Sequence, residues 1–225
     1  GHYIVPASGR AFTLLPEEIL KLEGIQFAVL ENGAVVWDWK SQCAVKQELI
    51  SKGMVKAILE DIENKTPEGY YAEIIVNGKV YTDIKIQKEL EHSGIAGNFA
   101  DYMRKNHIFI ERLSSRNELL DNAEKLNIYF KDVKISEIVR AKWQKEPLLN
   151  VTTSVGGNVE FTAAGINKGH GIKILQQRME IPKKQCIAIG DDENDLEMFE
   201  QVHMAVAMGN AKDCVKRAAN AVTLN

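Results

Sequence analysis

The segment from Lys184 to Phe199, KQCIAIGDDENDLEMF, constrains the fold of this chain more than any other. Its apolar run, Cys186 to Ile189, ends in a glycine and a cluster of acids, and an amphipathic helix pattern follows directly. This order predicts a strand of a parallel sheet, covered on both faces, with Asp191 just past its carboxyl end, where open α/β sheets bind ligands. Asn194 and Asp195 then lie at the start of a helix, whose unpaired N–H groups attract anions.

Composition and charge exclude several classes of partner. The chain has 225 residues and a formal net charge of −3, with acids and bases scattered along it, so neither nucleic acid nor a membrane surface is an expected partner. No apolar stretch approaches membrane-spanning length, and the three widely spaced cysteines favour reduced thiols in a cytoplasmic protein. We therefore expect a small-molecule partner, and a monomer or a homodimer.

Three zones follow one another along the chain. Residues 1–40 predict an opening buried strand at Tyr3–Ala7 and a hairpin over Phe27–Trp37, with a type I′ turn at Asn32-Gly33. From residue 41, amphipathic helices alternate with short strands in the order αββ, αβ, αβ, αββ, and the last two strands form a hairpin over Asn150–Val155 and Val159–Thr162. Residues 163–225 return to the strand-then-helix rhythm of a doubly wound sheet. We interpret 1–40 and 152–225 as one core domain, into which 41–151 is inserted as a second domain.

Motifs in the core segments resemble a known superfamily. Ser8 after a strand, Asn167-Lys168-Gly169 at the start of a helix, and Gly190–Asp195 resemble the second, third and fourth motifs of the haloacid dehalogenase superfamily. Glu31–Ala34, Ala207–Ala211 and the order of the inserted elements resemble its Cof-type branch of sugar-phosphate phosphatases. The resemblance implies an α/β fold, a Rossmann-like doubly wound parallel sheet with an inserted α+β cap domain. It also implies a Mg²⁺-dependent phosphatase that hydrolyses small phosphate monoesters through an aspartyl-phosphate intermediate.

Four of the motif residues are expected to bind the phosphate. Phosphoryl transfer needs cations and hydrogen-bond donors around the phosphate. Ser8 and Gly9 follow a strand, and the Ser8 hydroxyl is a donor for a phosphoryl oxygen. By resemblance, Lys168 steadies the charge of the phosphate and the nucleophile, and Asn194 bonds the phosphate. Turn formation explains Ser8 without catalysis, and a solvated surface position explains Lys168.

The acids of the fourth motif are the candidate magnesium ligands. Carboxylate oxygens are the ligands that Mg²⁺ prefers, and Asp191 is the strongest candidate. Four acids lie between Asp191 and Asp195 and would repel one another without a cation, which favours a bound metal ion. Asp195 is expected to support either the metal shell or Lys168. Helix capping is the alternative role for these acids.

The superfamily's first motif, Asp-x-Asp-Gly-Thr, is missing from this sequence, which contains no Asp-x-Asp. In the family one of these Asp residues attacks phosphorus and the other is the general acid and base. Removing a covalent nucleophile costs on the order of 10⁶ in rate, or roughly 8 kcal/mol of barrier, so the 225 residues alone are expected to be inactive. Both ends of the sequence look cut, since Tyr3–Ala7 has no lead-in and Ala221–Asn225 no closing helix. We expect the nucleophile to lie upstream of Gly1.

Three other functions stay open at this point. One is a pseudoenzyme that binds phosphate or metal, the second is a phosphomutase-like transferase with the same kind of cap, and the third is a non-catalytic α/β module whose acids bind a divalent ion. Substrate choice is expected to lie in the cap. His107, Arg112 and Arg116 are candidate contacts there, and a solvated charged face explains them as well.

Overall fold

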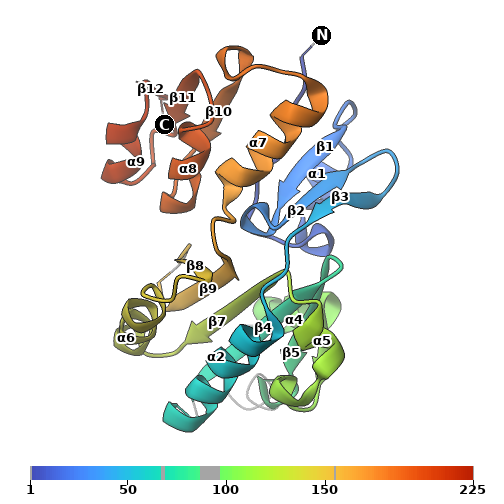
Figure 1. Ribbon diagram of the computed structural model, residues 1–225, viewed down its shortest axis with the longest axis vertical. Coiled ribbons are helices and arrows are strands. Elements are labelled where there is room, and N and C mark those ends of the chain that lie inside the picture. Colours follow the sequence, from blue (N-terminus) through green and yellow to red (C-terminus); the bar gives the residue numbers. More distant parts are fainter. Residues whose placement is uncertain (1, 67–68, 87–96, 155, 225) are drawn as a thin grey trace.

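The computed structural model describes residues 2–66, 69–86, 97–154 and 156–224. Figure 1 shows two lobes: the N-terminal and C-terminal parts of the chain lie together in the upper lobe, and the middle of the chain forms the lower lobe. This arrangement is the one expected from the predicted insertion of one domain into another. None of the described helices combines the length and the apolar character that a membrane span requires.

The upper lobe begins with an antiparallel sheet in the order β1-β2-β3. Its elements are η1 (Phe12–Leu14), α1 (Glu17–Leu20), β1 (Phe27–Leu30), β2 (Val35–Asp38) and β3 (Cys43–Gln47). The predicted hairpin is confirmed, but its connection is a longer turn, η2 (Glu31–Gly33), whose three residues all have positive φ. The turn differs from type I′ because it bonds a distant segment: the Asn32 N–H donates to the carbonyl of Ser8 at 3.1 Å.

The opening segment is not the buried strand that we predicted. Ala7 makes a single parallel bridge to Val29, and side chains before it face solvent, with Tyr3 53% and Ile4 67% exposed. The segment contacts β1 on one side, and no described strand pairs with its other side. We predicted burial from the apolar sequence pattern alone, and the segment is less buried than this pattern indicated.

The rest of the upper lobe is a parallel sheet in the order β10-β11-β12. Its elements in chain order are α7 (Lys168–Met179), η4 (Lys183–Gln185), β10 (Ile187–Gly190), η5 (Glu193–Asp195), α8 (Leu196–Phe199), β11 (Met204–Ala207), α9 (Asp213–Ala218) and β12 (Ala221–Val222). Parallel strands joined by helices confirm the α/β class. Coverage of β10 on both faces was a wrong prediction: Ile187 and Ile189, on one face, are 65% and 60% exposed, while Ala188 and Gly190, on the other, are buried. Among the described residues β10 is also an edge strand.

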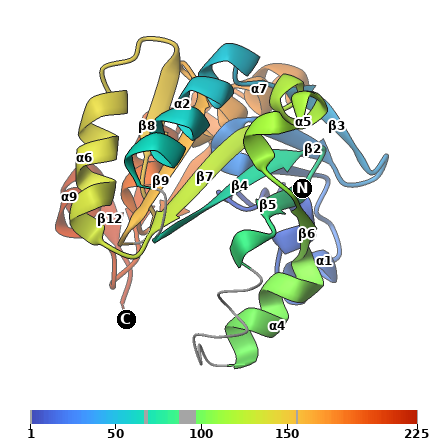
Figure 2. The same cartoon turned by 90° about the horizontal axis from the view of Figure 1, so that it is seen from below.

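The lower lobe is built on a six-stranded sheet in the order β6-β5-β4-β7-β9-β8. Its strands are β4 (Tyr70–Val76), β5 (Lys79–Asp83), β6 (His107–Ile110), β7 (Lys125–Phe130), β8 (Leu149–Thr152) and β9 (Asn158–Ala163). Its helices are α2 (Lys52–Lys65), α4 (Gly97–Asn106), η3 (Leu113–Ser115), α5 (Asn117–Asp121) and α6 (Val133–Trp143). Ile58 of α2 and Val139 of α6 share one apolar core with Ile128 of β7, and α4 lies apart from these helices (Figure 2).

The sheets divide the chain at residues that differ from the predicted boundaries of 41 and 151. β3 pairs with β2 and therefore stays in the upper lobe. The β8–β9 hairpin continues the sheet of β7, so residues up to Ala163 belong to the lower lobe. We accordingly propose residues 48–163 as the inserted cap domain.

The face of the lower sheet opposite α2 and α6 is polar and buried. Side chains alternate between the two faces of a strand, so the residues between the apolar positions of β4, β7 and β9 share this face, where His107 of β6 bonds Glu73. The side chains of this face are at most 7% exposed: Glu73, His107, Lys125, Asn127, Asn158 and Glu160. Buried polar groups require hydrogen-bond partners, and Lys125 and Glu160 find partners in the upper lobe.

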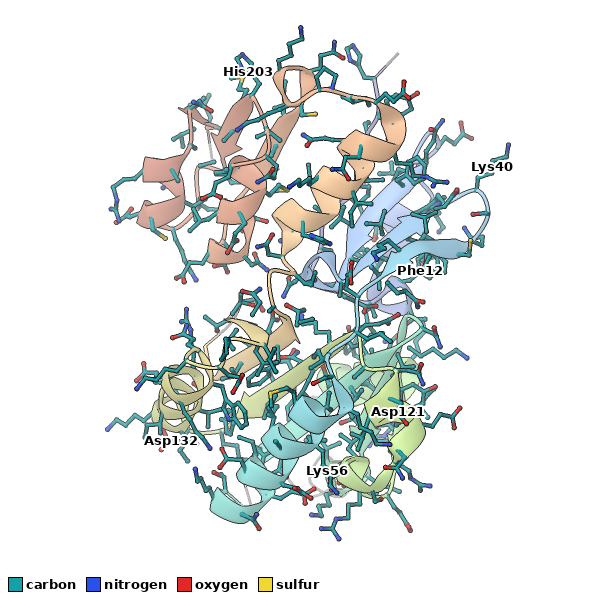
Figure 3. The ribbon with its side chains drawn as sticks, viewed as in Figure 1. Phe12, Lys40, Lys56, Asp121, Asp132 and His203 are labelled. Atoms are coloured by element: carbon teal, nitrogen blue, oxygen red, sulfur yellow. The ribbon has the colours of Figure 1, made fainter. Side chains whose placement is uncertain are left out.

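Contacts from η1 to the turn between β4 and β5 join the lobes near Phe12, which lies at their junction in Figure 3. Within the upper lobe, the Phe12 ring stacks on Trp37 with centroids 4.6 Å apart. The hydroxyl of the next residue, Thr13, donates to the carbonyl of Gly78, in the turn between β4 and β5, at 2.7 Å. The cap is thus fixed to the core at this end of its sheet.

A pair of carboxyl groups is buried at the same junction. Glu31 of the core and Glu124 of the cap are both fully buried, and Glu124 accepts hydrogen bonds from the Gln47 side chain at 2.6 Å and the Gly78 N–H at 3.3 Å. With both carboxyls ionised, Glu31 has no donor within hydrogen-bonding distance among the described residues. Burial, and then the nearby Glu124, raises the pKa of Glu31 well above its ordinary value. A protonated Glu31 donates to Glu124.

Glu31→Gln is expected to remove part of the pH dependence of stability. The unfolded chain releases this proton near pH 4.5, while the folded protein holds it to higher pH. The free energy of unfolding therefore falls as pH rises from 4.5 towards the raised pKa, by at most about 1.4 kcal/mol per pH unit from this group. Urea unfolding from pH 5 to pH 8 checks this, with the exposed Glu18→Gln as control. Equal pH dependence in Glu31→Gln and the wild type would show that Glu31 folds ionised.

Candidate active site

Lys168 is a buried cation at the start of α7. Asn167 caps the helix, its side chain accepting from the His170 N–H at 2.9 Å. Only 8% of the Lys168 side chain is exposed, and its Nζ lies 2.6 Å from Asp195 Oδ1 and 3.1 Å from Asn194 Oδ1. The structure therefore brings together the third and fourth motifs, as the sequence predicted.

Two close backbone approaches fix the position of Lys168. Gly33, with φ of +93°, packs so closely that a Cβ there would overlap the carbonyl group of Asn167. A Cβ at Gly169 would overlap the carbonyl oxygen of Glu197, on α8. The hairpin connection and α8 thus hold the first turn of α7 from two sides, and only glycine permits both contacts.

Asp195 organises the loop after β10. Its Oδ2 accepts from the backbone N–H groups of Asp191 at 2.9 Å and Asp192 at 3.2 Å, while Oδ1 faces Lys168. The Asp192 carboxylate caps the following turn, accepting from the Glu193 N–H at 2.6 Å. Asp195 therefore links the strand end, the turn and the buried lysine in one hydrogen-bonded unit.

Cations of the protein balance most of the acid cluster. Asp192 lies 2.6 Å from Lys212 Nζ, and Glu193 lies 3.4 Å from Lys212 and 3.7 Å from Arg140. The hydrogen bond to Asp192 raises the pKa of Lys212 above its ordinary value. Asp195 is paired to Lys168. Cations of the protein therefore relieve the mutual repulsion of three of the four acids, and for these three the repulsion no longer calls for a metal ion. The sequence did not reveal these partners, because they come from distant elements.

Asp191 is the acid of this cluster without a cation partner in the described part of the chain. Its side chain is exposed just past the end of β10, in the predicted position. Both oxygens of Asp195 already accept hydrogen bonds, so of the two predicted metal ligands only Asp191 has a free carboxylate. Among the described residues, no group of three His, Cys, Asp or Glu residues is placed to hold a metal ion. Asp191 suits one position of a Mg²⁺ shell, and the remaining oxygen ligands would have to come from elsewhere. The metal-binding roles of Asp191 and Asp195 stay predictions.

Ser8 and Gly9 lie in a loop against Asn32. The Ser8 hydroxyl accepts from the Arg10 N–H at 3.1 Å, which leaves its proton available to donate. A Cβ on Gly9 would lie 2.7 Å from Asn32 Oδ1 and 3.4 Å from Lys125 Nζ. The carbonyl of Gly9 accepts from Lys125 Nζ at 2.9 Å. The loop of the second motif is therefore in contact with both lobes.

Asn32 connects the motif residues to the cap. Its Oδ1 accepts from Asn194 Nδ2 at 3.2 Å, and its Nδ2 donates to Glu160 Oε2 at 2.6 Å. Glu160 in turn lies 3.1 Å from Lys125 Nζ, and both side chains are at most 5% exposed. Burial alone would raise the pKa of Glu160, but the charge of Lys125 and the hydrogen bond from Asn32 lower it below its ordinary value. A continuous chain of contacts runs from Asp195 to the Ser8–Gly9 loop.

Sequence reasoning missed Lys125 and Glu160. The only local signal was the alternation of polar residues Lys125, Asn127 and Tyr129 along β7, which marks a polar sheet face but not what it faces. Of the cap residues that we did single out, His107 bonds Glu73 at 2.9 Å and is buried. The other two also have partners within the cap: Arg112 pairs with Glu63 at 3.4 Å, and Arg116 Nε donates to the carbonyl of Glu111 at 3.4 Å.

Comparisons with known proteins agree on the kind of protein that this chain resembles. The phosphatase YwpJ of Bacillus subtilis (strain 168) is 29% identical over 248 residues, which cover 100% of this chain and 83% of that protein. The 5-amino-6-(5-phospho-D-ribitylamino)uracil phosphatase YcsE of the same organism is 26% identical over 223 residues, 99% of this chain and 76% of that protein. The structure of a haloacid dehalogenase-like hydrolase from B. subtilis matches with a TM-score of 0.80 at 24% identity, covering 100% of this chain and 83% of that one.

Another solved structure and a family model extend the agreement. BT4131, described as a sugar phosphatase of HAD subclass IIB, matches with a TM-score of 0.79 at 20% identity, over 99% of this chain and 80% of that one. The family model for haloacid dehalogenase-like hydrolases matches residues 1–225. Because this match spans the whole of the given sequence, the chain belongs to the family of haloacid dehalogenase-like hydrolases.

Proposed function

We propose that this chain is the greater part of a Cof-type phosphoric monoester hydrolase that acts on small phosphate esters, in particular sugar phosphates, in the cytoplasm. One observation carries the proposal: the buried ammonium group of Lys168, bonded to Asn194, is connected through Asn32 to the Ser8–Gly9 loop. The two B. subtilis relatives named as phosphatases support the same reaction class. Cys43, Cys186 and Cys214 are all free, which suits a reducing compartment.

The roles of the residues follow from the charge of a phosphate ester. Phosphoryl transfer is accelerated mainly by positioning and by neutralising charge on the phosphoryl oxygens. In the proposal Lys168 supplies the cation, while Ser8, the Gly9 backbone and Asn194 supply hydrogen bonds. Mg²⁺, held partly by Asp191, supplies further neutralisation when bound. Asp195 holds Lys168 in place.

We further propose that the nucleophilic Asp comes from a segment that precedes Gly1 and pairs with the outer edge of β10. The exposed Ile187 and Ile189 of β10, and the exposed Tyr3 and Ile4 of the opening segment, support an additional strand between them. A parallel strand in that position would end beside Asp191 and Ser8. It would bring the missing carboxylates to the proposed phosphate and metal site.

The test compares the 225-residue chain with the complete gene product on a panel of sugar phosphates. The gene product is expected to release phosphate with Mg²⁺ and to stop on chelation, at a rate on the order of 10⁶ above that of the shorter chain. Equal activity of the two would contradict an upstream nucleophile. Inactivity of both, with phosphate binding retained, would establish the pseudoenzyme, which the missing Asp-x-Asp favours as the second candidate. Product analysis with an added sugar acceptor separates hydrolysis from phosphomutase-like transfer.

A further inference from the structure

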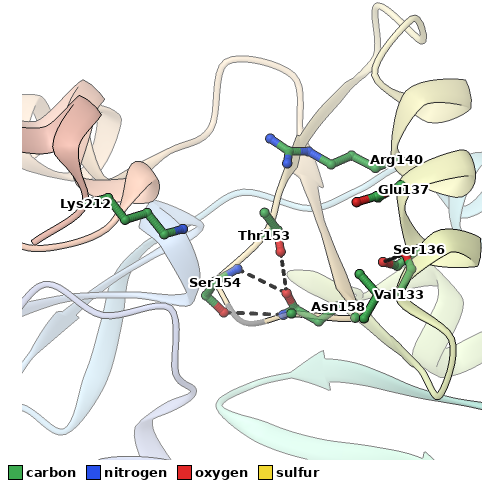
Figure 4. A pocket seen from close by; sticks show the side chains of 10 residues that line it. Val133, Ser136, Glu137, Arg140, Thr153, Ser154, Asn158 and Lys212 are labelled. Atoms are coloured by element: carbon green, nitrogen blue, oxygen red, sulfur yellow. Dashed lines mark hydrogen bonds between the residues drawn. The ribbon is translucent and has the colours of Figure 1, made fainter.

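A pocket of about 280 Å³ lies between the two lobes, beside the candidate active site. The cap supplies α6 and the β8–β9 hairpin as walls, and the core supplies Lys212, just before α9. The polar lining includes Ser136, Glu137, Arg140, Ser154, Asn158 and Lys212. Figure 4 shows Arg140 and Lys212 extending from the two lobes towards the same space, above the hairpin turn that carries Ser154.

Both walls of this pocket bond directly to the site. On the core side, the Lys212 N–H donates to the carbonyl of Asp191 at 3.2 Å. On the cap side, the Ser154 hydroxyl donates to Glu160 Oε1 at 2.8 Å, and the other oxygen of Glu160 accepts from Asn32. The walls of the pocket therefore adjoin the proposed phosphate site from both lobes.

Arg140 is incompletely bonded in the pocket wall. Its Nε is buried and has no hydrogen-bond partner among the described residues. Its Nη2 makes a long contact, 3.7 Å, with Glu193, which it shares with Lys212. A buried N–H without an acceptor is costly, and the planar guanidinium group suits a carboxylate or phosphate that accepts two of its hydrogen bonds. Glu137, the acid in the lining, has an exposed side chain, so solvent screens its charge.

We propose that this pocket binds the distal part of the phosphate ester and selects esters that carry a second anionic group. A carboxylate or second phosphate in the pocket accepts hydrogen bonds from Arg140 Nε and Nη and lies near Lys212. It displaces Glu193, which contacts both of these cations in the structure. The inference rests on the proposed function, since it places the transferred phosphate beside Lys168. It narrows the substrate class from sugar phosphates in general to acidic or doubly phosphorylated ones.

The experiment measures binding to the full 225-residue chain by calorimetry. The probes are 6-phosphogluconate and glucitol 6-phosphate, which differ only in a carboxylate in place of a hydroxymethyl group. The wild type is expected to bind 6-phosphogluconate about tenfold more tightly. Arg140→Gln is expected to abolish that preference while leaving the affinity for glucitol 6-phosphate within about twofold. Arg140→Lys retains the charge without the Nε donor and is expected to restore part of the preference. Lys134→Gln, an equal charge change on an exposed position of α6, is expected to change neither affinity.

Three results would overturn the inference: no preference in the wild type, an equal loss for both probes in Arg140→Gln, or the same loss in Lys134→Gln. Lys168→Met tests the phosphate site separately and is expected to weaken the binding of both probes. If Lys168→Met leaves both affinities unchanged, the proposed function fails, whatever Arg140 shows.

Discussion

Lys168→Met is expected to lower both phosphate binding and stability. Asp195 keeps two backbone hydrogen bonds but loses its cation, and its side chain is only 6% exposed. Breaking a buried ion pair by removing one partner costs about 3–5 kcal/mol of the free energy of unfolding, because the other charge stays buried. Urea unfolding measures this loss. In the complete gene product, hydrolysis of a phosphate ester is expected to fall by at least about 10².

The double variant Lys168→Met/Asp195→Asn separates the two effects. Removing the unpaired charge is expected to restore most of the stability, since the neutral amide that replaces the carboxylate needs no cation beside it, while phosphate binding stays lost. Lys173→Met, at an exposed position of the same helix, is the matched control. If Lys168→Met and this control unfold at the same urea concentration, the buried ion pair does not contribute about 3–5 kcal/mol to the free energy of unfolding.

Gly33→Ala is expected to cause a comparable loss of stability without touching a charged group. The new Cβ would overlap the carbonyl group of Asn167, at a residue whose φ is +93°. The left-handed conformation and the overlap together cost about 3 kcal/mol. Since Asn167 caps α7, relief of the overlap would displace Lys168 and weaken phosphate binding as well.

Gly24→Ala is the control for the energetic cost of the left-handed backbone conformation alone. Gly24 has φ of +86°, and nothing lies within 4 Å of a Cβ built there, so this change is expected to cost only the conformational part, about 1 kcal/mol. Thermal or urea unfolding of both variants gives the difference. Equal losses at Gly33 and Gly24 would show that the contact with Asn167 relaxes freely and does not position Lys168.

The sequence predicted the positions of helices and strands better than it predicted what packs against them. The helix pattern near Met54 and the strand that ends before Asp191 are visible locally, because the period of apolar residues reports which face of an element is buried. The period does not report whether another element covers the second face of a strand. For that reason Ile187 and Ile189 were expected to be buried and are exposed.

The same limit explains the outcome at the site. Lys168, Asn194 and Asp195 were predictable because the family resemblance places them in short motifs at helix starts. Lys125 and Glu160 were not, since their meeting with Gly9 and Asn32 depends on how the cap lies on the core. Long-range contacts of this kind leave little trace in local sequence.

An NMR titration of this chain with inorganic phosphate in the presence of Mg²⁺ shows whether phosphate binds around Lys168. Amide shifts are expected to concentrate at Ser8, Gly9, Asn194 and the first turn of α7, and to be abolished by Lys168→Met but not by Lys173→Met. Saturable shifts centred on another surface, or an unchanged titration in Lys168→Met, would contradict a phosphate site built around Lys168.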